Sequence, residues 1–355
     1  MNASAGLVSD AKIKTAILGY GRSGSTLHAD PLEGLPDQFA VTAICDIDPQ
    51  AQAKARARFP CPVYSDYHEM LAAQDLDLVV IVTRSDQHCA MTCDCLRGGA
   101  HVLVTKPWAV AAGEAERMIA TAAATGRQLL PWLPARWGCD LIRLKELVAS
   151  GIIGEIFMVR RREFNFGLRS DWQTRKQFGG GYLLNWGPHI VDQAMQLVGG
   201  RVISAYGQLR QIINPGDVED VFHAVLITQT GVILSCEYAI AVNKLPNWVI
   251  QGNRGTIFVK ETAIEIHRTD LPETIDPQDY RTKVQITESR EELTGGHRIT
   301  MDNRYGDPFV VYPAIAQALR GAAPYPVTTD SALALSRVLD AIRLSNATNQ
   351  VVPLS

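Results

Sequence analysis

The sequence has no long hydrophobic run. Its longest apolar stretches, such as residues 78–82 and 101–104, have the length of a strand. They fall far short of the roughly 20 residues that a bilayer-spanning helix needs. Residues 1–11 lack a basic segment followed by an apolar one, so they do not resemble a secretory signal. We therefore expect no membrane partner and, by default, a cytoplasmic location.

An excess of charge of either sign is also missing. The chain has 34 Lys and Arg residues against 37 Asp and Glu residues, which gives a formal net charge of -3. A nucleic-acid partner is not expected, because binding the phosphate backbone requires a basic surface. A small, neutral or weakly charged molecule fits this composition better as the substrate.

Cysteine is sparse and its number is odd. The 7 cysteines are spread along 355 residues, unlike the dense pattern of a disulfide-stapled secreted scaffold. Cys89, Cys93 and Cys95 lie near His88 on a predicted helix. Cys89 and Cys93 share a face, whereas Cys95 points elsewhere, and no second ligand pair follows. We expect ordinary buried thiols and no metal site.

The chain is too long for one ordinary domain, so we expect two. The first, residues 1–130, alternates short β-rich runs with segments of helical period, which is typical of βαβ units and a doubly wound parallel sheet. Strands are predicted at residues 15–18, 41–45, 78–82, 101–104 and 128–130, and helices at 50–59, 68–73, 90–97 and 111–125.

The second domain, residues 131–355, has a different pattern. It combines predicted helices with consecutive strands separated by turn signals, which indicates an α+β domain with a large, mostly antiparallel open sheet. Its predicted strands are residues 156–164, 202–210, 222–228, 232–239 and 248–252, and its predicted helices are 141–150, 307–320 and 330–346, the last two closing the structure.

A glycine-rich motif directly follows the first predicted strand. The spacing G-x-G-x-x-G is typical of dinucleotide-binding loops, and the candidate cofactor-binding residues here are Gly19, Tyr20, Gly21, Arg22, Ser23 and Gly24. Gly19 permits the tight turn and Gly21 lets a pyrophosphate approach the backbone. Gly24 allows the next helix to pack closely with its first amides facing the phosphates.

An acidic residue ends the second predicted strand, about 20 residues after the last glycine. At this position the carboxylate of Asp46 can accept hydrogen bonds from both ribose hydroxyls, and its charge would repel a 2′-phosphate. The pattern favours NAD over NADP, although Arg22 weakens this preference.

Two segments offer acid–base chemistry. Lys106-Pro107 follows the fifth predicted strand, at the carboxyl edge where ligands of parallel sheets bind. A partly desolvated ammonium there can donate to a substrate hydroxyl or relay its proton, although a salt-bridging lysine is the simpler interpretation. Residues 179–192 form a glycine-rich loop that enters a helix.

On that helix Asn185, His189 and Asp192 recur at i, i+4 and i+7, so they share one face. His189 is the natural general base for an alcohol proton, and Asp192 can orient it or bind a hydroxyl. A core histidine and an N-capping role for Asn185 remain open alternatives, and Pro188 suits a first helical turn.

These residues together resemble the Gfo/Idh/MocA family, named for glucose-fructose oxidoreductase and inositol dehydrogenase. The resemblance covers nearly the whole chain from Lys14 and includes Ser85 and His88, which we add to the candidate cofactor site. It implies a Rossmann domain, a nicotinamide cofactor, and an open sheet used for homodimer or homotetramer contacts. It also implies catalytic roles for Lys106 and His189, with Asp192 at a neighbouring acidic position.

Two departures from the family pattern affect the chemistry. Thr105 replaces the usual glutamate before the lysine, and Asn185 occupies a position that is aspartate in many members, so its side chain cannot take a proton. Further candidate substrate-binding residues are Arg136, Arg169, Trp172 and Gln173. Trp172 would offer a sugar ring an apolar platform, but packing under the sheet is an equal alternative.

The resemblance implies an NAD(P)-dependent oxidoreductase acting on a secondary alcohol or ketone of a sugar, inositol or sugar derivative. In this mechanism the Lys106 amine and the His189 imidazole converge on the bound nicotinamide. Two alternatives stay open, namely glycoside cleavage through transient oxidation and a non-catalytic, cofactor-binding regulator. The sequence does not specify the sugar, the direction or the stereochemistry.

Overall fold

The computed structural model describes residues 11–243, 245–272, 274, 278, 284–293 and 304–354. These residues form two compact units. The first unit comprises Met1–Pro134, Arg175–Gly180 and Asp307–Arg337, and the second comprises Ala135–Thr174, Gly181–Gly306 and Val338–Ser355. A single boundary at residue 130, as predicted from the sequence, differs from this division, because two later segments pack with the first unit.

The first unit is built on a parallel six-stranded sheet, counted over the described residues. Its strand order is β3-β2-β1-β4-β5-β6, so the order reverses between β1 and β4. Strands β4 and β5 are buried along their whole length, as expected for a parallel sheet covered on both faces. The strands are β1 (Ile13–Leu18), β2 (Phe39–Cys45), β3 (Val63–Tyr64), β4 (Leu78–Ile81), β5 (His101–Val104) and β6 (Leu129–Pro131).

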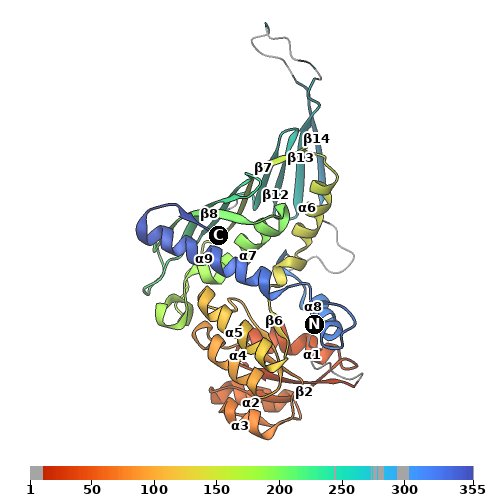
Figure 1. Ribbon diagram of the computed structural model, residues 1–355, viewed down its shortest axis with the longest axis vertical. Coiled ribbons are helices and arrows are strands. Elements are labelled where there is room, and N and C mark those ends of the chain that lie inside the picture. Colours follow the sequence, from red (N-terminus) through yellow and green to blue (C-terminus); the bar gives the residue numbers. More distant parts are fainter. Residues whose placement is uncertain are drawn as a thin grey trace. The chain divides into compact units, whose positions relative to one another are not determined.

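Helices connect these strands, and local signals fix their ends. Asp48 caps α2 by accepting from the backbone N–H of Gln50, and Gly126 ends α5 at a left-handed φ of 65°. Helices α4 and α5 pack against each other, and α1 contacts α8 (Figure 1). The helical segments are η1 (Gly24–His28), α1 (Ala29–Gly34), α2 (Pro49–Arg58), α3 (Tyr67–Ala73), η2 (Ser85–Gln87), α4 (His88–Arg97), α5 (Ala112–Thr125), η5 (Lys176–Phe178) and α8 (Pro308–Leu319).

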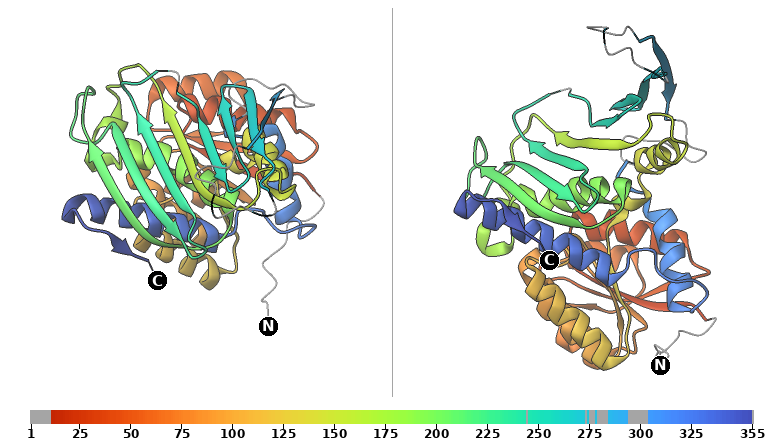
Figure 2. Two further views of the ribbon diagram at one scale, coloured as in Figure 1. Left: turned by 90° about the horizontal axis from the view of Figure 1, so that it is seen from above. Right: turned by 45° about the horizontal axis from the view of Figure 1, so that its top comes forward.

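The second unit is built on a nine-stranded sheet, counted over the described residues, in the order β14-β13-β12-β11-β7-β10-β9-β8-β15. Only the pairing of β7 with β10 is parallel among these described strands, and Figure 2 shows them side by side. The strands are β7 (Ile156–Phe164), β8 (Val202–Arg210), β9 (Val221–Thr228), β10 (Ile233–Ala239), β11 (Trp248–Gly252), β12 (Gly255–Lys260), β13 (Ala263–Thr269), β14 (Ile286–Glu292) and β15 (Val352–Pro353).

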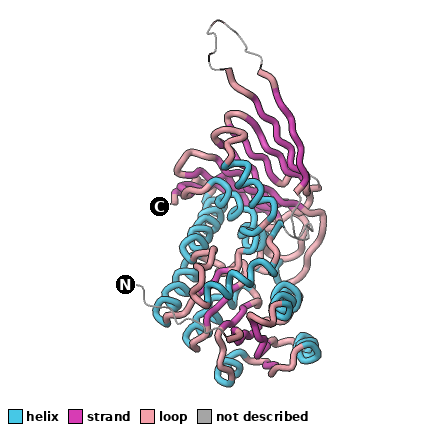
Figure 3. The backbone as a smooth tube through the Cα atoms, turned by 90° about the vertical axis from the view of Figure 1, so that its right-hand side faces the viewer, coloured by secondary structure: helices cyan, strands magenta, loops and turns pink. Residues whose placement is uncertain are grey.

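One face of this sheet carries the core of the second unit. Alternate residues of β9, β10 and β11 are buried, and helix α7 (Tyr182–Val198) packs on β7, β9 and β10. Figure 3 shows this division between strands and helices. The remaining helical segments are η3 (Pro134–Trp137), α6 (Cys139–Ala149), η4 (Trp172–Thr174) and α9 (Thr329–Thr348), which runs through both units.

The fold class predicted from the sequence is confirmed, with a Rossmann sheet followed by a mostly antiparallel sheet. The predicted strands and helices recur within a few residues of their expected bounds. The short strands β3 and β15, and the strands β12, β13 and β14, had not been predicted.

Candidate active site

The glycine loop between β1 and η1 has the geometry that a dinucleotide requires. Gly19 has φ 99°, and a Cβ there would lie 2.6 Å from the Val82 carbonyl oxygen. A Cβ on Gly24 would lie 2.0 Å from the carbonyl oxygen of Gly19, so the loop and helix pack too closely for a side chain. A Cβ on Gly21 would meet nothing within 4 Å. The backbone at Gly21 is therefore open to a pyrophosphate.

The carboxylate of Asp46 lies beside this loop. Its Oδ2 accepts from the backbone N–H of Tyr20 at 2.6 Å, and its Oδ1 accepts from that of Asp48 at 2.8 Å. These bonds orient the carboxylate and leave each oxygen with acceptor capacity for a ribose hydroxyl. The Tyr20 ring is buried edge-on against Phe59, so Tyr20 offers its backbone to the loop, whereas Arg22 is exposed and Ser23 is half-buried.

The loops after β4 and β5 are joined by a buried histidine. One ring nitrogen of His88 lies 2.8 Å from the Pro107 carbonyl oxygen and the other lies 3.0 Å from that of Thr83. Burial lowers the pKa of His88, against the opposing effect of the two carbonyl groups, so the ring is neutral and only one nitrogen donates. His88 thus fixes the loop that carries Lys106.

Ser85, Thr105 and Lys106 also lie at the carboxyl edge of the sheet, in the loops after β4 and β5. Lys106 is half-buried. The hydroxyl of Thr105, in place of the usual glutamate, donates to the Ile81 carbonyl oxygen at 3.0 Å and ties β5 to β4. Ser85 is buried, and a Cβ on Gly179 would lie 2.8 Å from its Cβ. Gly179 belongs to the first unit, so this close packing on Ser85 lies within that unit.

Helix α7 begins earlier than the proline suggested. Its first residue is Tyr182, so Pro188 lies inside the helix and not in the first turn. The N-cap is Gly181, and Asn185 donates its backbone N–H to the Gly181 carbonyl oxygen at 2.9 Å. Asn185 is therefore a helical residue, and the N-capping alternative for it is wrong. The Glu219 carboxylate instead accepts from the backbone N–H of Leu183 at 2.9 Å.

His189 lies among aromatic rings. His189 is buried, and the centroid of its ring lies 5.8 Å from that of Trp186 and 5.3 Å from that of Tyr305. Trp186 in turn stacks on Tyr238 at 5.2 Å with an interplanar angle of 19°. An imidazole held between rings in this way has a restricted orientation.

Asp192 is not presented to solvent. It is 0% exposed, and its two oxygens accept from Nε and Nη2 of Arg136 at 2.9 and 2.8 Å. This bidentate ion pair between η3 and α7 brings together two predicted site residues. The pair orients both groups, and the predicted roles of Asp192 and Arg136 toward His189 or a substrate stay predictions.

The remaining predicted substrate residues lie on the segment before α7. Arg169 makes a bidentate ion pair with Asp171 at 2.7 and 2.8 Å, and its backbone N–H donates to the Asn214 side chain. Trp172 and Gln173 are half-buried, and both belong to η4. The Gln173 carbonyl oxygen accepts from the backbone N–H of Gly181, which links this segment to the start of α7.

The thiols on α4 pack against α5. Cys89 accepts from Arg117 at 3.0 Å and Cys93 accepts from Thr121 at 3.4 Å. Across the described ranges, no group of three or more His, Cys, Asp or Glu side chains is arranged to hold a metal ion. Over the same part of the chain, none of the helices combines the length and the apolar character needed to cross a bilayer.

Sequence reasoning missed the groups that hold α7 and the aromatic rings beside His189. Tyr182 and Trp186 precede it on α7 at helical spacing, so the period of the 179–192 block was a usable signal for them. Tyr238, Tyr305 and Glu219 come from distant segments, and their approach to α7 depends on the fold.

Comparison with known proteins identifies the family. Residues 13–131 match the oxidoreductase family with an NAD-binding Rossmann fold, and residues 141–258 match the GFO/IDH/MocA C-terminal domain. An uncharacterised oxidoreductase of Schizosaccharomyces pombe is 31% identical over 316 residues, which is 86% of this chain and 81% of that protein. The scyllo-inositol 2-dehydrogenase (NADP(+)) IolW of Bacillus subtilis is 26% identical over 352 residues, 96% of each chain.

The fold is also found in solved structures. The WlbA dehydrogenase from Bordetella pertussis, in complex with NADH and UDP-GlcNAcA, aligns with a TM-score of 0.79 at 23% identity, over 97% of this chain and 99% of that chain. The first unit is thus an NAD-binding Rossmann domain, and the protein belongs to the Gfo/Idh/MocA family of oxidoreductases.

Proposed function

We propose that this oxidoreductase transfers a hydride between NAD and a secondary alcohol or ketone of a sugar, inositol or sugar derivative. The observation that supports the proposal is the glycine loop. Of its three motif glycines, only Gly21 has no atom of the described residues within 4 Å of the place where a Cβ would lie, so a ligand can approach the backbone there. The substrate class is supported by relatives. Besides the inositol dehydrogenase above, the D-glucoside 3-dehydrogenase of Escherichia coli is 31% identical over 191 residues, 53% of this chain and 54% of that protein.

The roles of the cofactor residues follow from the loop geometry. The backbone at Gly21 and the first amides of the following helix receive the pyrophosphate, with Arg22 and Ser23 beside them. Asp46 receives the ribose hydroxyls, and its negative charge favours NAD over NADP. Ser85, His88 and Lys106 line the carboxyl edge on the nicotinamide side. A nicotinamide bound there would supply the hydride acceptor or donor for the substrate carbon.

His189 and Lys106 provide the acid–base chemistry of the proposal. As the alcohol is oxidised, the imidazole of His189 takes the hydroxyl proton and the ammonium of Lys106 donates a hydrogen bond to the substrate oxygen. The amide of Asn185 donates a hydrogen bond to a substrate hydroxyl but cannot take up its proton. Arg169, Trp172 and Gln173 stay predicted substrate contacts.

Asp192 and Arg136 have a positioning role in this proposal. Their ion pair is buried and joins η3 to α7, one turn after His189. Two hydrogen bonds from one guanidinium fix the orientation of this carboxylate. The pair therefore holds the helix on which the base lies.

The test is the absorbance of reduced cofactor when the purified protein meets NAD, or NADP, with a panel of inositols, sugars and glycosides. We expect turnover with at least one member and a preference for NAD. The variant His189→Ala should lose at least about 10²-fold in kcat, the usual contribution of a general base. His223→Ala, which removes an exposed histidine of β9, is the matched control and should not change turnover.

Other outcomes of this test would favour a different function. Turnover by no member of the panel, together with tight NAD binding, would contradict the proposal and favour a cofactor-binding regulator, which the departures at Thr105 and Asn185 motivate. Release of an aglycone without net reduced NAD would indicate glycoside cleavage through transient oxidation. The homodimer or homotetramer and the cytoplasmic location stay predictions.

A further inference from the structure

Helix α7 is weakened just before the proposed base. Pro188 lies inside the helix, where its ring has no N–H to donate to the carbonyl oxygen of Leu184, four residues earlier. The Glu219 carboxylate holds the first turn of α7, which lies before this interruption. His189 follows the interruption, so contacts of α7 beyond Pro188 bear more directly on the orientation of the imidazole.

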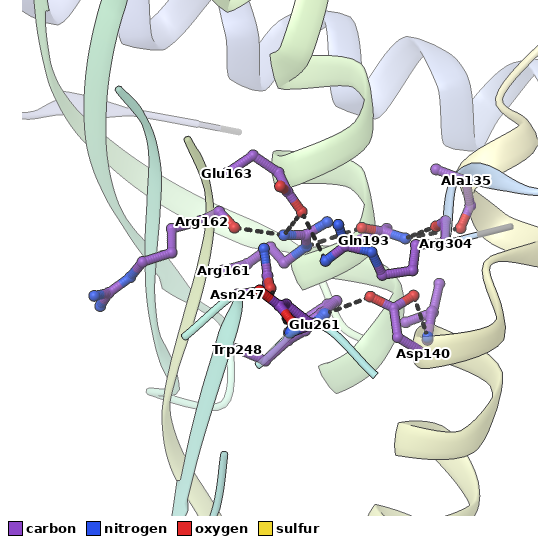
Figure 4. Close-up of polar contacts among 11 residues, drawn as sticks. Ala135, Asp140, Arg161, Arg162, Glu163, Gln193, Asn247, Trp248, Glu261 and Arg304 are labelled. Carbon is purple, nitrogen blue, oxygen red and sulfur yellow. Dashed lines mark hydrogen bonds and ion pairs between the residues drawn. The ribbon is translucent and has the colours of Figure 1, made fainter. Parts of the chain in front are cut away.

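Gln193 supplies such contacts one turn after His189. It follows His189 by four residues, so the two side chains are neighbours on the helix surface. Gln193 is 0% exposed, and its side-chain oxygen accepts from Arg161 Nε at 2.9 Å. Its amide nitrogen donates to the backbone oxygens of Ala135 at 3.0 Å and Arg304 at 3.1 Å (Figure 4). One side chain thus joins α7 to three other segments.

The acceptor end of this amide meets an arginine that is itself held in place. Arg161 of β7 is 0% exposed, and its Nη1 donates to Glu163 Oε1 at 2.7 Å. Its guanidinium lies over the Trp248 ring, 4.8 Å from the centroid, and the indole nitrogen donates to the Asp140 carboxylate at 2.8 Å (Figure 4). Arg161 is therefore a fixed donor to Gln193, because a carboxylate and an aromatic ring both restrict it.

The donor end of the amide fixes the backbone beside a ring that contacts the imidazole. Arg304, whose carbonyl oxygen accepts from Gln193, directly precedes Tyr305. The ring centroid of Tyr305 lies 5.3 Å from that of His189, at an interplanar angle of 52°. Ala135, which accepts the other bond, directly precedes the arginine that pairs with α7. Gln193 thus bears on His189 in two ways, through the helix that carries both residues and through the backbone that carries the neighbouring ring.

We propose that Gln193 is a positioning residue for His189, fixing both the rotation of α7 after Pro188 and the backbone beside the Tyr305 ring. The inference rests on the proposed function of His189 and adds to it. The amide of Gln193 is 0% exposed, so it acts through the helix and not by touching the substrate.

The chemistry of an amide suits this role. Its oxygen accepts and its nitrogen donates, so one planar group binds a guanidinium at one end and two carbonyl oxygens at the other. Each hydrogen bond tolerates only a narrow range of geometry, and three bonds on one side chain leave the helix little freedom to rotate. An apolar side chain of the same length would fill the space but would set no direction.

The first test uses no substrate. In protein labelled with ¹³C in histidine, the ring resonances of His189 are assigned by their loss in His189→Ala. Gln193→Met keeps the length of the side chain and removes its hydrogen bonds. We expect the His189 resonances to shift in this variant, because the ring currents of the neighbouring aromatic side chains change when the helix turns. Gln128→Met is the matched control and should cause no shift, since Gln128 also donates to a backbone oxygen, that of Ala318, but within the first unit.

The second test is kinetic and uses the best substrate of the panel. Gln193→Met should lower kcat at least tenfold with the substrate KM and the NAD Kd unchanged, because a misplaced catalytic group loses rate. Gln128→Met should match the parent in kcat per folded molecule. Gln193→Glu keeps an acceptor for Arg161, but its carboxylate cannot donate to the two carbonyl oxygens, so it should lose kcat in the same way. A merely structural role would lower the melting temperature and the active fraction together and leave kcat per folded molecule unchanged.

Either of two results would overturn the inference. One is a Gln193→Met protein in which the His189 resonances match those of the parent. The other is a kcat per folded molecule equal to that of the parent, whatever happens to KM. If Gln193→Met fails to fold, Gln193→Glu decides by the same two measurements. If the parent turns over nothing, the proposed function fails, while the resonances still decide whether Gln193 orients His189.

Discussion

At the scale of the residue, the ion pair of Arg136 and Asp192 shows that burial decides which group a charged side chain contacts. On the sequence, Asp192 is a carboxylate one turn from a candidate base and available to a substrate. In the structure its oxygens accept two hydrogen bonds from one guanidinium, at 2.9 and 2.8 Å. The Asp192 carboxylate therefore already has a charged partner within the protein, the Arg136 guanidinium.

This arrangement predicts the cost of separating the pair. Asp192→Asn should lower the free energy of unfolding by about 3 kcal/mol, because it leaves the Arg136 charge buried without a counter-charge. Adding Arg136→Gln to that variant should restore most of the loss. Denaturation with urea measures both. Glu291→Gln, which breaks a more exposed ion pair with Arg143, should cost at most about 1 kcal/mol.

Activity of the double variant then separates positioning from direct chemistry. If Asp192 holds α7, the variant lacking both charges keeps much of the turnover of the parent. A stable double variant with no turnover would instead show that the carboxylate acts on the substrate, against the positioning role.

At the scale of the element, helix α7 depends on a cap from outside its own segment. Glu219, two residues before β9, accepts from the backbone N–H of Leu183, in the first turn of α7. Gly181 at the N-cap has φ 108°, and a Cβ there would lie 2.5 Å from the Glu219 carboxylate. The glycine is therefore required both by its backbone angle and by the approach of the cap.

Removing this cap should loosen the start of the helix. Glu219→Ala should lower the free energy of unfolding by about 1 kcal/mol, the usual contribution of a capping side chain. Glu219→Gln keeps an acceptor oxygen and should stay close to the parent. Hydrogen exchange of the amides of residues 182–186 measures the effect locally, and equal protection in all three proteins would contradict it.

At the scale of the whole molecule, buried histidines such as His28 link the stability of the first unit to pH. His28 is buried, hydrogen-bonded through Nδ1 to the Tyr312 hydroxyl at 2.8 Å, and close to Trp132. Burial lowers its pKa to about 3. Between pH 6.5, the ordinary value, and pH 3, the unfolded chain therefore binds a proton that the folded chain excludes.

The sign of the effect follows from this difference. The contribution of His28 is fully present above pH 6.5, and stability is lost as the pH falls through the range from 6.5 to 3, by up to about 1.4 kcal/mol per pH unit. Urea unfolding at pH 7, 6 and 5 measures this slope. His28→Gln does not titrate and should make the slope less steep, whatever its own cost at pH 7, whereas His88, whose pKa burial also lowers, still contributes. An unchanged slope would show that other groups dominate.

Much of the architecture was already determined by local signals. The fully apolar runs of β4 and β5, the Asp48 cap of α2 and the Gly126 stop of α5 act over a few residues, so the parallel sheet and its helices could be predicted. The glycine loop with Asp46 was predictable for the same reason. The start of α7 was not, because its cap comes from Glu219, more than thirty residues away in the chain.

The sequence by itself determined the fold class, the dinucleotide loop and the family, because these depend on spacing along the chain. The tertiary structure decided which charges are paired and which ring faces the proposed base. Arg161, Gln193 and the pair Arg304-Tyr305 lie on three separated segments, and no periodic pattern relates them. Their contacts exist only after the second sheet and α7 have packed, since burial selects partners by distance in space and not along the chain.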